Sequence, residues 1–137
     1  GEMKMRVTGT FKATNFQPVA EDFTGGVRAA LPVGVMRMEK LYSGEVSGRS
    51  ATIFTSAFDP SRGVGFYTAL ESFEGTIGGR SGTFVFMHSA ATSGRDRSEE
   101  SFHIVARSGT GEFKGIAGTG GMDIDDTSHR IWFDLAD

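Results

Sequence analysis

The sequence predicts an all-β protein, a closed eight-stranded antiparallel up-and-down β-barrel, and three observations support this. Twenty glycines stand against only three prolines, and they separate runs rich in phenylalanine and β-branched residues. Several of these runs alternate polar and apolar residues with a period of two, which is typical of strands with one buried face. Most connections have hairpin length, and closing such a meander removes exposed sheet edges.

The first half of the chain contains four expected strands. Residues 5–16 alternate regularly and predict the first, while residues 17–32 predict a long connection with a helical turn near Glu21. Residues 34–43 and 49–58 predict two strands around a turn at 44–48, and residues 65–75 predict a fourth. The sequence does not decide which face of residues 34–43 points inward. One face carries Met36, Met38, Lys40 and Tyr42, and the other carries Arg37, Glu39 and Leu41.

The second half begins with a hairpin at Gly78 and Gly79, because adjacent glycines suit the primed turns that match strand twist. Residues 81–90 predict the fifth strand, residues 92–98 a polar turn, and residues 99–106 the sixth strand. Residues 108–118 hold too many glycines for a strand and predict a compact loop or one helical turn. The last two strands are expected at 119–125 and 130–135, joined by Asp126, Thr127 and Ser128.

Length and composition limit the classes of function. A chain of 137 residues corresponds to a single β-barrel domain, from which we exclude Gly1 and Glu2 as an expected non-native remnant. The net charge of −3 and pI near 5.6 argue against nucleic acid as a partner. The absence of cysteine fits a reducing compartment. No apolar run approaches the ~20 residues of a membrane span and no signal peptide is visible, so we expect a cytoplasmic protein without a membrane partner.

The candidate site lies in the stretch 67–89, which places Glu71 and His88 inside apolar strands around the glycine hairpin. A carboxyl on the inner face of a barrel has a perturbed pKa, and a Glu–His pair can move a proton, so these two are the candidate catalytic residues. The structural alternative is an ion pair of Glu71 with Lys40 or Arg80, or a glutamate exposed at a rim. The candidate substrate-binding residues are Lys40, Tyr42, Tyr67, Phe84 and Phe86.

No cofactor and no metal site are expected. A turn centred between Arg95 and Asp96 would set His88 opposite His103 as a metal pair, whereas a register chosen by burial would turn His103 outward. Zinc needs three or four ligands, and His129 sits in a distant turn. The glycines at 109, 111 and 115 lack the spacing of a dinucleotide-binding loop.

Three segments carry a resemblance to a known family. They are KLYSG at 40–44 with Gly48, the stretch 67–88 including ALESFEGTIGGRSGTF, and SGTGE at 108–112 with Gly115 and Gly118. On these segments the chain resembles the bacterial domain-of-unknown-function 3224 family (DUF3224), whose members resemble the allene oxide cyclase barrel. The family usually has glutamine where Met87 stands and proline where Ala106 stands. The resemblance implies a closed eight-stranded barrel and oligomerisation.

Three functional hypotheses follow. The first is a cofactor-independent isomerase or cyclase that acts on a small, largely apolar metabolite, with Glu71 and His88 steering protons or charge. The second is a non-catalytic, lipocalin-like barrel that binds a small apolar ligand, and the third is a filled structural oligomer. For a homo-oligomer we expect the contact at strand 130–135, where Trp132 opposes Ile131, Phe133 and Leu135.

Overall fold

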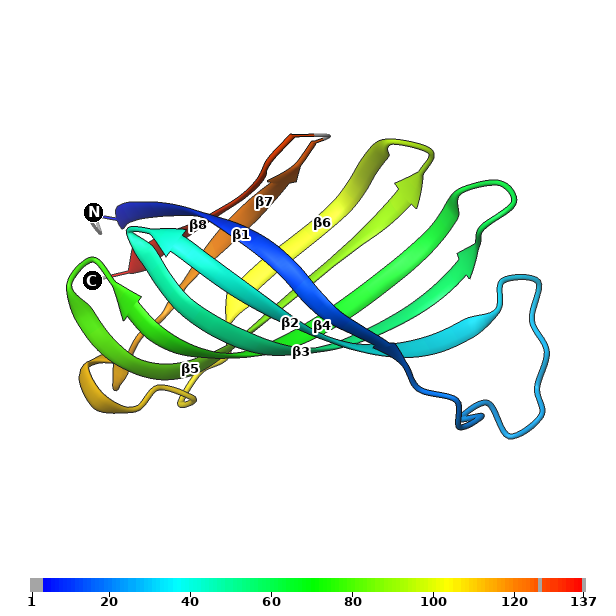
Figure 1. The fold of residues 1–137 in the computed structure, drawn as a ribbon, viewed down its shortest axis with the longest axis horizontal. Helices are drawn as coiled ribbons and strands as arrows, with labels where there is room; N and C mark the ends of the chain where they lie inside the picture. Colours follow the sequence, from blue (N-terminus) through cyan, green and yellow to red (C-terminus); the bar gives the residue numbers. More distant parts are fainter. Residues whose placement is uncertain (1–3, 126, 137) are drawn as a thin grey trace.

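The computed structural model describes residues 4–125 and 127–136, so the expectation for Gly1 and Glu2 and the position of Asp126 lie outside it. The chain forms a closed barrel of eight antiparallel strands in sequence order, as the sequence predicts (Figure 1). The strands are β1 (Lys4–Pro18), β2 (Val33–Gly44), β3 (Val46–Asp59), β4 (Val64–Ile77), β5 (Arg80–Ser93), β6 (Asp96–Ile104), β7 (Gly118–Ile124) and β8 (His129–Ala136). A 3-10 turn, η1 (Gly111–Phe113), precedes β7, in agreement with the expected loop.

Closure of the barrel depends on pairing between its first and last strands. Strand β1 pairs with β8 from Lys4 opposite Ala136 to Thr10 opposite Arg130. The neighbouring strands β6 and β7 are joined much less, by the one described pair His103 and Thr119. The barrel wall is therefore weakest between β6 and β7.

The connections differ from the expected ones in three places. The helical turn expected near Glu21 is absent, because the side chain of Asp22 accepts hydrogen bonds from the backbone N–H and hydroxyl of Thr24 and forms a local turn instead. The turn expected at 44–48 contracts to one residue, Glu45, between β2 and β3. The polar turn expected at 92–98 contracts to Gly94 and Arg95, so that β5 and β6 are both longer at this end.

The glycine hairpin between β4 and β5 forms as expected. Gly78 and Gly79 have φ of 56° and 86°, which are the two positive values that a type I′ turn requires. All fourteen residues of β4 pair with β5 without a bulge, from Ile77 opposite Arg80 to Val64 opposite Ser93. The alternation of inner and outer side chains is therefore preserved along the whole hairpin.

One half of the interior is solid. Six phenylalanine rings pack there with centroids 5.2–6.5 Å apart, and Phe113 from η1 closes that end of the barrel; the rings are Phe73, Phe84, Phe86, Phe102, Phe113 and Phe133. Rings in such tilted and edge-on contacts stabilise a core beyond the area that they bury. The filled half thus stabilises the barrel, and the buried polar residues lie on the side of it that faces the other half of the interior.

The structure also determines the inner face of β2, which the sequence left open. Lys40 and Tyr42 are buried, while Leu41 between them is exposed. Among the described residues there is no helix long and apolar enough to cross a membrane. The cytoplasmic location stays a prediction.

Candidate functional site

The site is built mainly on the β4–β5 hairpin. Tyr67, Ala69, Glu71 and Phe73 alternate inward along β4, as the sequence predicts. On β5 the inward residues include Phe86 and His88, which pair directly with Glu71 and Ala69. His88 is therefore a diagonal neighbour of Glu71 on the same face, within reach of its carboxylate.

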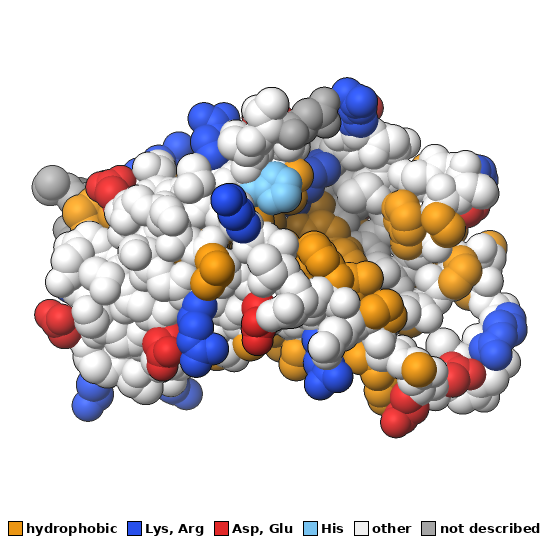
Figure 2. Space-filling view, in the orientation of Figure 1, with side chains coloured by type: hydrophobic (Ala, Val, Ile, Leu, Met, Phe, Trp, Pro, Cys, Tyr) orange, Lys and Arg blue, Asp and Glu red, His pale blue; other side chains and the backbone are white. Residues whose placement is uncertain are grey.

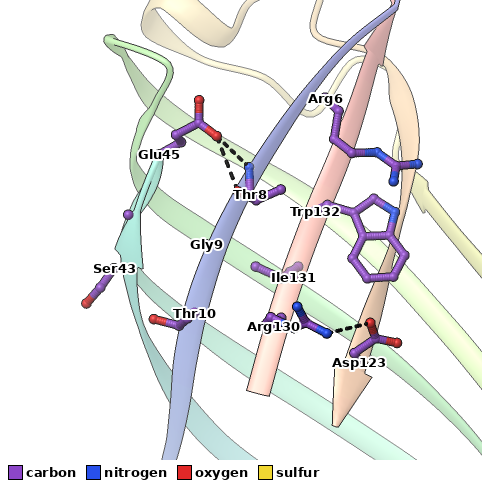
Figure 3. A pocket seen from close by; sticks show the side chains of 11 residues that line it. Arg6, Thr8, Gly9, Thr10, Ser43, Glu45, Asp123, Arg130, Ile131 and Trp132 are labelled. Atoms are coloured by element: carbon purple, nitrogen blue, oxygen red, sulfur yellow. Dashed lines mark hydrogen bonds and ion pairs between the residues drawn. The ribbon is translucent and has the colours of Figure 1, made fainter. Parts of the chain in front are cut away.

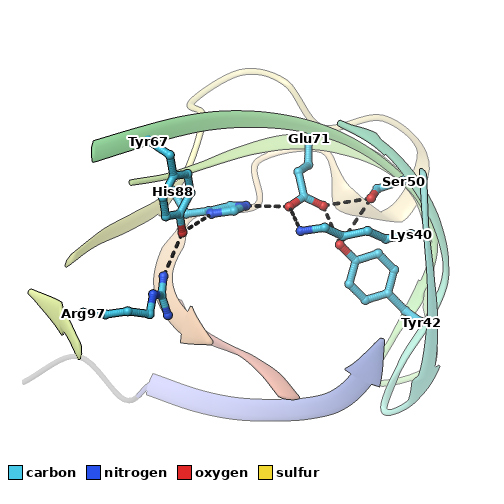
Figure 4. A network of polar contacts seen from close by, with 7 residues as sticks. All are labelled: Lys40, Tyr42, Ser50, Tyr67, Glu71, His88 and Arg97. Carbon is cyan, nitrogen blue, oxygen red and sulfur yellow. Dashed lines mark hydrogen bonds and ion pairs between the residues drawn. The ribbon is translucent and has the colours of Figure 1, made fainter. Parts of the chain in front are cut away.

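Glu71 is fully buried, with 0% of its surface exposed, and both of its carboxylate oxygens are hydrogen-bonded (Figure 4). Oε2 accepts hydrogen bonds from Lys40 Nζ at 2.6 Å and from His88 Nε2 at 2.5 Å. Oε1 accepts from the Tyr42 hydroxyl at 2.5 Å and from the Ser50 hydroxyl at 2.8 Å. Three neighbouring strands, β2, β3 and β5, thus converge on one carboxylate of β4.

These partners keep Glu71 ionised. Burial by itself would raise the pKa of its carboxyl, but the hydrogen bond from His88 and the positive charge of Lys40 outweigh burial and lower the pKa to about 2. Burial together with the Glu71 charge raises the pKa of the Tyr42 hydroxyl well above its usual value. At neutral pH the centre of the barrel therefore holds a carboxylate, an ammonium group and a protonated phenol.

A chain of hydrogen bonds leads from this carboxylate to the open end of the barrel. Arg97 donates to the Tyr67 hydroxyl at 2.7 Å, and that hydroxyl lies 2.9 Å from His88 Nδ1. Since the ionised Glu71 only accepts, His88 must carry its proton on Nε2. Burial lowers the pKa of His88 despite the opposing effect of Glu71, so the ring is neutral and its Nδ1 accepts the proton of Tyr67. Each member, from Arg97 through Tyr67 and His88 to Glu71, donates to the next.

The open half of the barrel is a cavity of about 620 Å³, within the size range of small-molecule sites. Hydrophobic side chains gather in a hollow on the face seen in Figure 2. The apolar part of the cavity lining is Phe11, Phe16, Met38, Phe54, Met122 and Ile124. The polar lining includes Lys40, Tyr67, His88 and Arg97, whereas Glu71, Tyr42 and Ser50 lie behind it.

The residues that reach the cavity from β6 and β7 meet across the weakest part of the wall. Arg97 of β6 donates from Nη1 to the backbone carbonyl of Met122 in β7 at 3.3 Å, and it also forms an ion pair with Glu100 at 3.2 Å. Burial raises the pKa of the Tyr67 phenol, although the charge of Arg97 opposes this. Tyr67 is therefore a protonated hydroxyl that lines the cavity with a cation on one side and an imidazole on the other.

The structure brings together most of the residues that the sequence proposed. Lys40, Tyr42, Tyr67, Glu71 and His88 form one connected network, and the ion pair of Glu71 with Lys40 that we weighed as a structural alternative is present. Its other proposed partner, Arg80, lies beside the hairpin turn opposite Ile77, six residues along β4 from Glu71. Phe84 and Phe86 pack in the filled half and do not line the cavity.

The His88–His103 metal pair, which the sequence disfavoured, does not form. His88 pairs with Phe102 rather than with His103, which lies exposed opposite Met87. The β5–β6 turn is centred one residue earlier than the metal register needs, between Gly94 and Arg95, which alone would set Ser101 opposite His88. A β-bulge between the pairs Ala91–Ser98 and Ser89–Ser101 shifts the register by one more residue, and burial of Phe102 and Ile104 selects the result. Within 4–125 and 127–136 there is no cluster of three or more His, Cys, Asp or Glu residues that would hold a metal.

Two residues of the network were missed. Arg97 falls in the stretch expected as a turn, although the Ser–Gly pair at 93–94 indicates a tighter hairpin that would place it on a strand. Ser50 gave no sequence indication. The hydroxyl of Thr52, which lies opposite Glu71 on β3, is buried without a hydrogen-bond partner among the described residues.

Comparison with known proteins identifies the family. The model of the family described as "Protein of unknown function (DUF3224)" matches residues 7–135. The chain belongs to the DUF3224 family. A solved structure of a DUF3224 member from Shewanella oneidensis MR-1, itself of unknown function, is 28% identical, with 96% of each chain covered and a TM-score of 0.82. No match is found among curated proteins. The likeness to allene oxide cyclase stays a prediction.

Proposed function

We propose that this DUF3224 barrel is a cofactor-independent isomerase or cyclase that moves a proton within a small, largely apolar molecule held in the open half of the barrel. The observation that carries the proposal is the directed chain of hydrogen bonds that joins the buried carboxylate of Glu71, through His88, to the Tyr67 hydroxyl at the cavity. A hydroxyl backed by an imidazole and a carboxylate has the arrangement of a catalytic triad.

In the proposed reaction, Tyr67 and His88 move the proton together. The Tyr67 oxygen takes a proton from a carbon next to a substrate carbonyl while its own proton passes to His88 Nδ1. The imidazolium that forms is stabilised by the Glu71 carboxylate at 2.5 Å. The proton of His88 then returns to Tyr67, which delivers a proton to a different carbon of the substrate, so that no proton is gained or lost overall.

Two cations support this reaction. Arg97, 2.7 Å from the Tyr67 hydroxyl, stabilises negative charge on that oxygen. Lys40 lines the cavity, donates to one Glu71 oxygen and lies over the Phe11 ring at 4.8 Å. An ammonium group has three N–H donors, so Lys40 is suited to hold the substrate carbonyl as an enolate forms. The apolar walls confine the substrate and strengthen these charge interactions by excluding water.

The experiment is a deuterium-exchange assay. A panel of β,γ-unsaturated ketones is incubated with the protein in D₂O, and exchange and double-bond migration are followed by NMR. Tyr67→Phe should reduce the rate at least ~100-fold, as expected for loss of an acid–base group. The matched control is Tyr42→Phe, which also removes a phenol from the network but from behind the cavity. It should keep the rate within about tenfold. Equal losses in the two variants would contradict the role of Tyr67.

A second candidate function is a non-catalytic binder of small apolar molecules. It is favoured by the low pKa of Glu71, because a carboxylate with four donors is also a stable structural centre. Binding of 1-anilinonaphthalene-8-sulfonate with equal affinity to the wild type and to Tyr67→Phe, without turnover of any ketone in the panel, would support this function over catalysis.

A further inference from the structure

The outer surface of the barrel has two unlike sides. Over β7, β8 and β1 it is charged: Arg6 bonds Asp134 and lies over the Trp132 ring, and Arg130 bonds Asp123 (Figure 3). The Trp132 ring is also in contact with the backbone of Gly121, where a Cβ atom would meet it at 2.4 Å. Trp132, which we expected at a subunit contact, is thus half-buried and packed in part against its own chain.

The opposite side, over β3, β4 and β5, carries no charge across a whole rectangle of the sheet. We call this rectangle the uncharged face: the outward residues of β3 from Ala51 to Ala57, of β4 from Phe66 to Ser72, and of β5 from Val85 to Ala91. These four positions on each of three strands lie directly opposite one another in the sheet. Six of the twelve positions are exposed, five are half-buried, and Ser89 is buried. A chain that is 23% charged would place about three charges among twelve positions taken at random, and charged residues prefer the surface.

Large apolar side chains are exposed at the middle of this face. Ile53 is 56% exposed and Leu70 is 50% exposed, and the two lie opposite each other on β3 and β4. Phe66 is 41% exposed near one end. Contiguous exposed apolar surface with a polar border is characteristic of protein–protein contacts.

We propose that the uncharged face binds the same face of a second copy of this chain, forming a two-fold dimer. Strands β3, β4 and β5 are paired with a neighbour along both edges, so a second copy can meet them only through their outer face, as packed sheets do. Both ends of the face are bordered by ion pairs that carry both signs, Arg49 with Glu74 and Arg62 with Asp59. Because each border carries both signs, an arginine of one copy can meet an acidic residue of the other in both directions, as the self-complementary contact of an isologous interface requires.

The area is sufficient for a stable dimer. With strands ~4.8 Å apart and a rise of ~3.4 Å per residue, twelve outward positions cover a flat area of roughly 400 Å². Because side chains stand out from the sheet, the accessible area is roughly 600–800 Å², close to the ~800 Å² that each partner buries in a standard interface. The inner sides of the same β4 and β5 carry Tyr67, Glu71 and His88, so the dimer would support the wall that holds the site.

The test is the mass of the protein in solution, measured by sedimentation velocity from ~1 to ~200 μM. The wild type should be a dimer of twice the 14.7 kDa chain mass, and Leu70→Glu should be a monomer because it places a charge at the centre of the contact. The matched control is Thr10→Glu, an exposed outward position of β1 on the charged side, which should stay dimeric.

A milder variant protects the test against misfolding. Leu70→Thr keeps a strand-forming residue and removes apolar area, and it should weaken dimerisation at least ~10-fold with an unchanged circular dichroism spectrum. A wild type that is monomeric at ~200 μM would overturn the proposal. So would a folded Leu70→Glu variant that remains dimeric, because the contact would then lie elsewhere.

Discussion

Replacing Glu71 by glutamine tests whether the buried carboxylate stabilises the barrel. The carboxylate accepts four hydrogen bonds, whereas an amide accepts only through its oxygen and presents an NH₂ group to the remaining donors. The substitution also leaves the buried ammonium group of Lys40 without its anion. Breaking a buried ion pair in this way typically costs ~3–5 kcal/mol.

The pKa of Glu71 gives a second estimate of the same size. Its fall from the ordinary 4.5 to about 2 corresponds to roughly 3 kcal/mol at 1.36 kcal/mol per pKa unit. Because the folded-state pKa is the lower one, this stability is present above about pH 4.5 and is lost as the pH falls toward 2. The Glu71→Gln variant should be ~3–5 kcal/mol less stable than wild type at pH 7, and should lose less additional stability on acidification.

Guanidinium unfolding at pH 7 and at pH 3, followed by circular dichroism, measures both effects. The matched control is Glu74→Gln on the same strand, whose exposed ion pair with Arg49 at 3.2 Å should contribute less than ~1 kcal/mol. A double variant, Glu71→Gln with Lys40→Met, should recover much of the loss because no unpaired charge remains. A Glu71→Gln protein within ~1 kcal/mol of wild type at pH 7 would refute the reasoning.

Three further predictions concern the filled half, a close backbone approach and the imidazole. Phe84→Ala should lower the free energy of unfolding by ~3–5 kcal/mol because it empties a fully buried site, whereas Phe16→Ala at the exposed mouth should change it by less than ~1 kcal/mol in the same denaturation assay. Gly75→Ala should lower the melting temperature by several degrees or prevent folding, since its Cβ would lie 2.1 Å from the carbonyl oxygen of Ser47. Long-range ¹H–¹⁵N NMR should find His88 neutral and protonated on Nε2 at pH 7 to 8, because burial lowers its pKa, and an imidazolium pattern at pH 7 would contradict the hydrogen-bond directions assigned to it.

The β4–β5 hairpin was predictable because short-range rules decide it. Strict alternation places Glu71 and His88 on inner faces, and the glycine pair fixes the turn, so the register follows from the sequence. The inner face of β2 was not predictable, because each of its two faces carries a charged residue. Lys40 is buried only because Glu71, 31 positions along the chain, supplies its anion, and a local pattern does not contain that information.

Arg97 shows a second reason why part of the site could not be predicted from the sequence. A run of small and charged residues at 92–98 has the composition of a loop, but pairing in the closed barrel extends β5 and β6 through it to a two-residue turn. Cross-strand pairing therefore outweighs local propensity. The same extension brings Arg97 to Tyr67, so the outermost member of the network followed from the length of a hairpin rather than from any motif.

The division of the interior into a solid half and a hollow half separates two kinds of evolutionary constraint. Substitutions among the packed rings around Phe84 change the stability of the whole barrel, whereas the cavity-lining Phe16 and Ile124 are exposed and can change size with little effect on folding. Relatives with the same scaffold can therefore differ in the shape of this cavity without first becoming unstable. For protein engineers, the barrel offers a stable base on which the chemistry of the cavity can be rebuilt one side chain at a time.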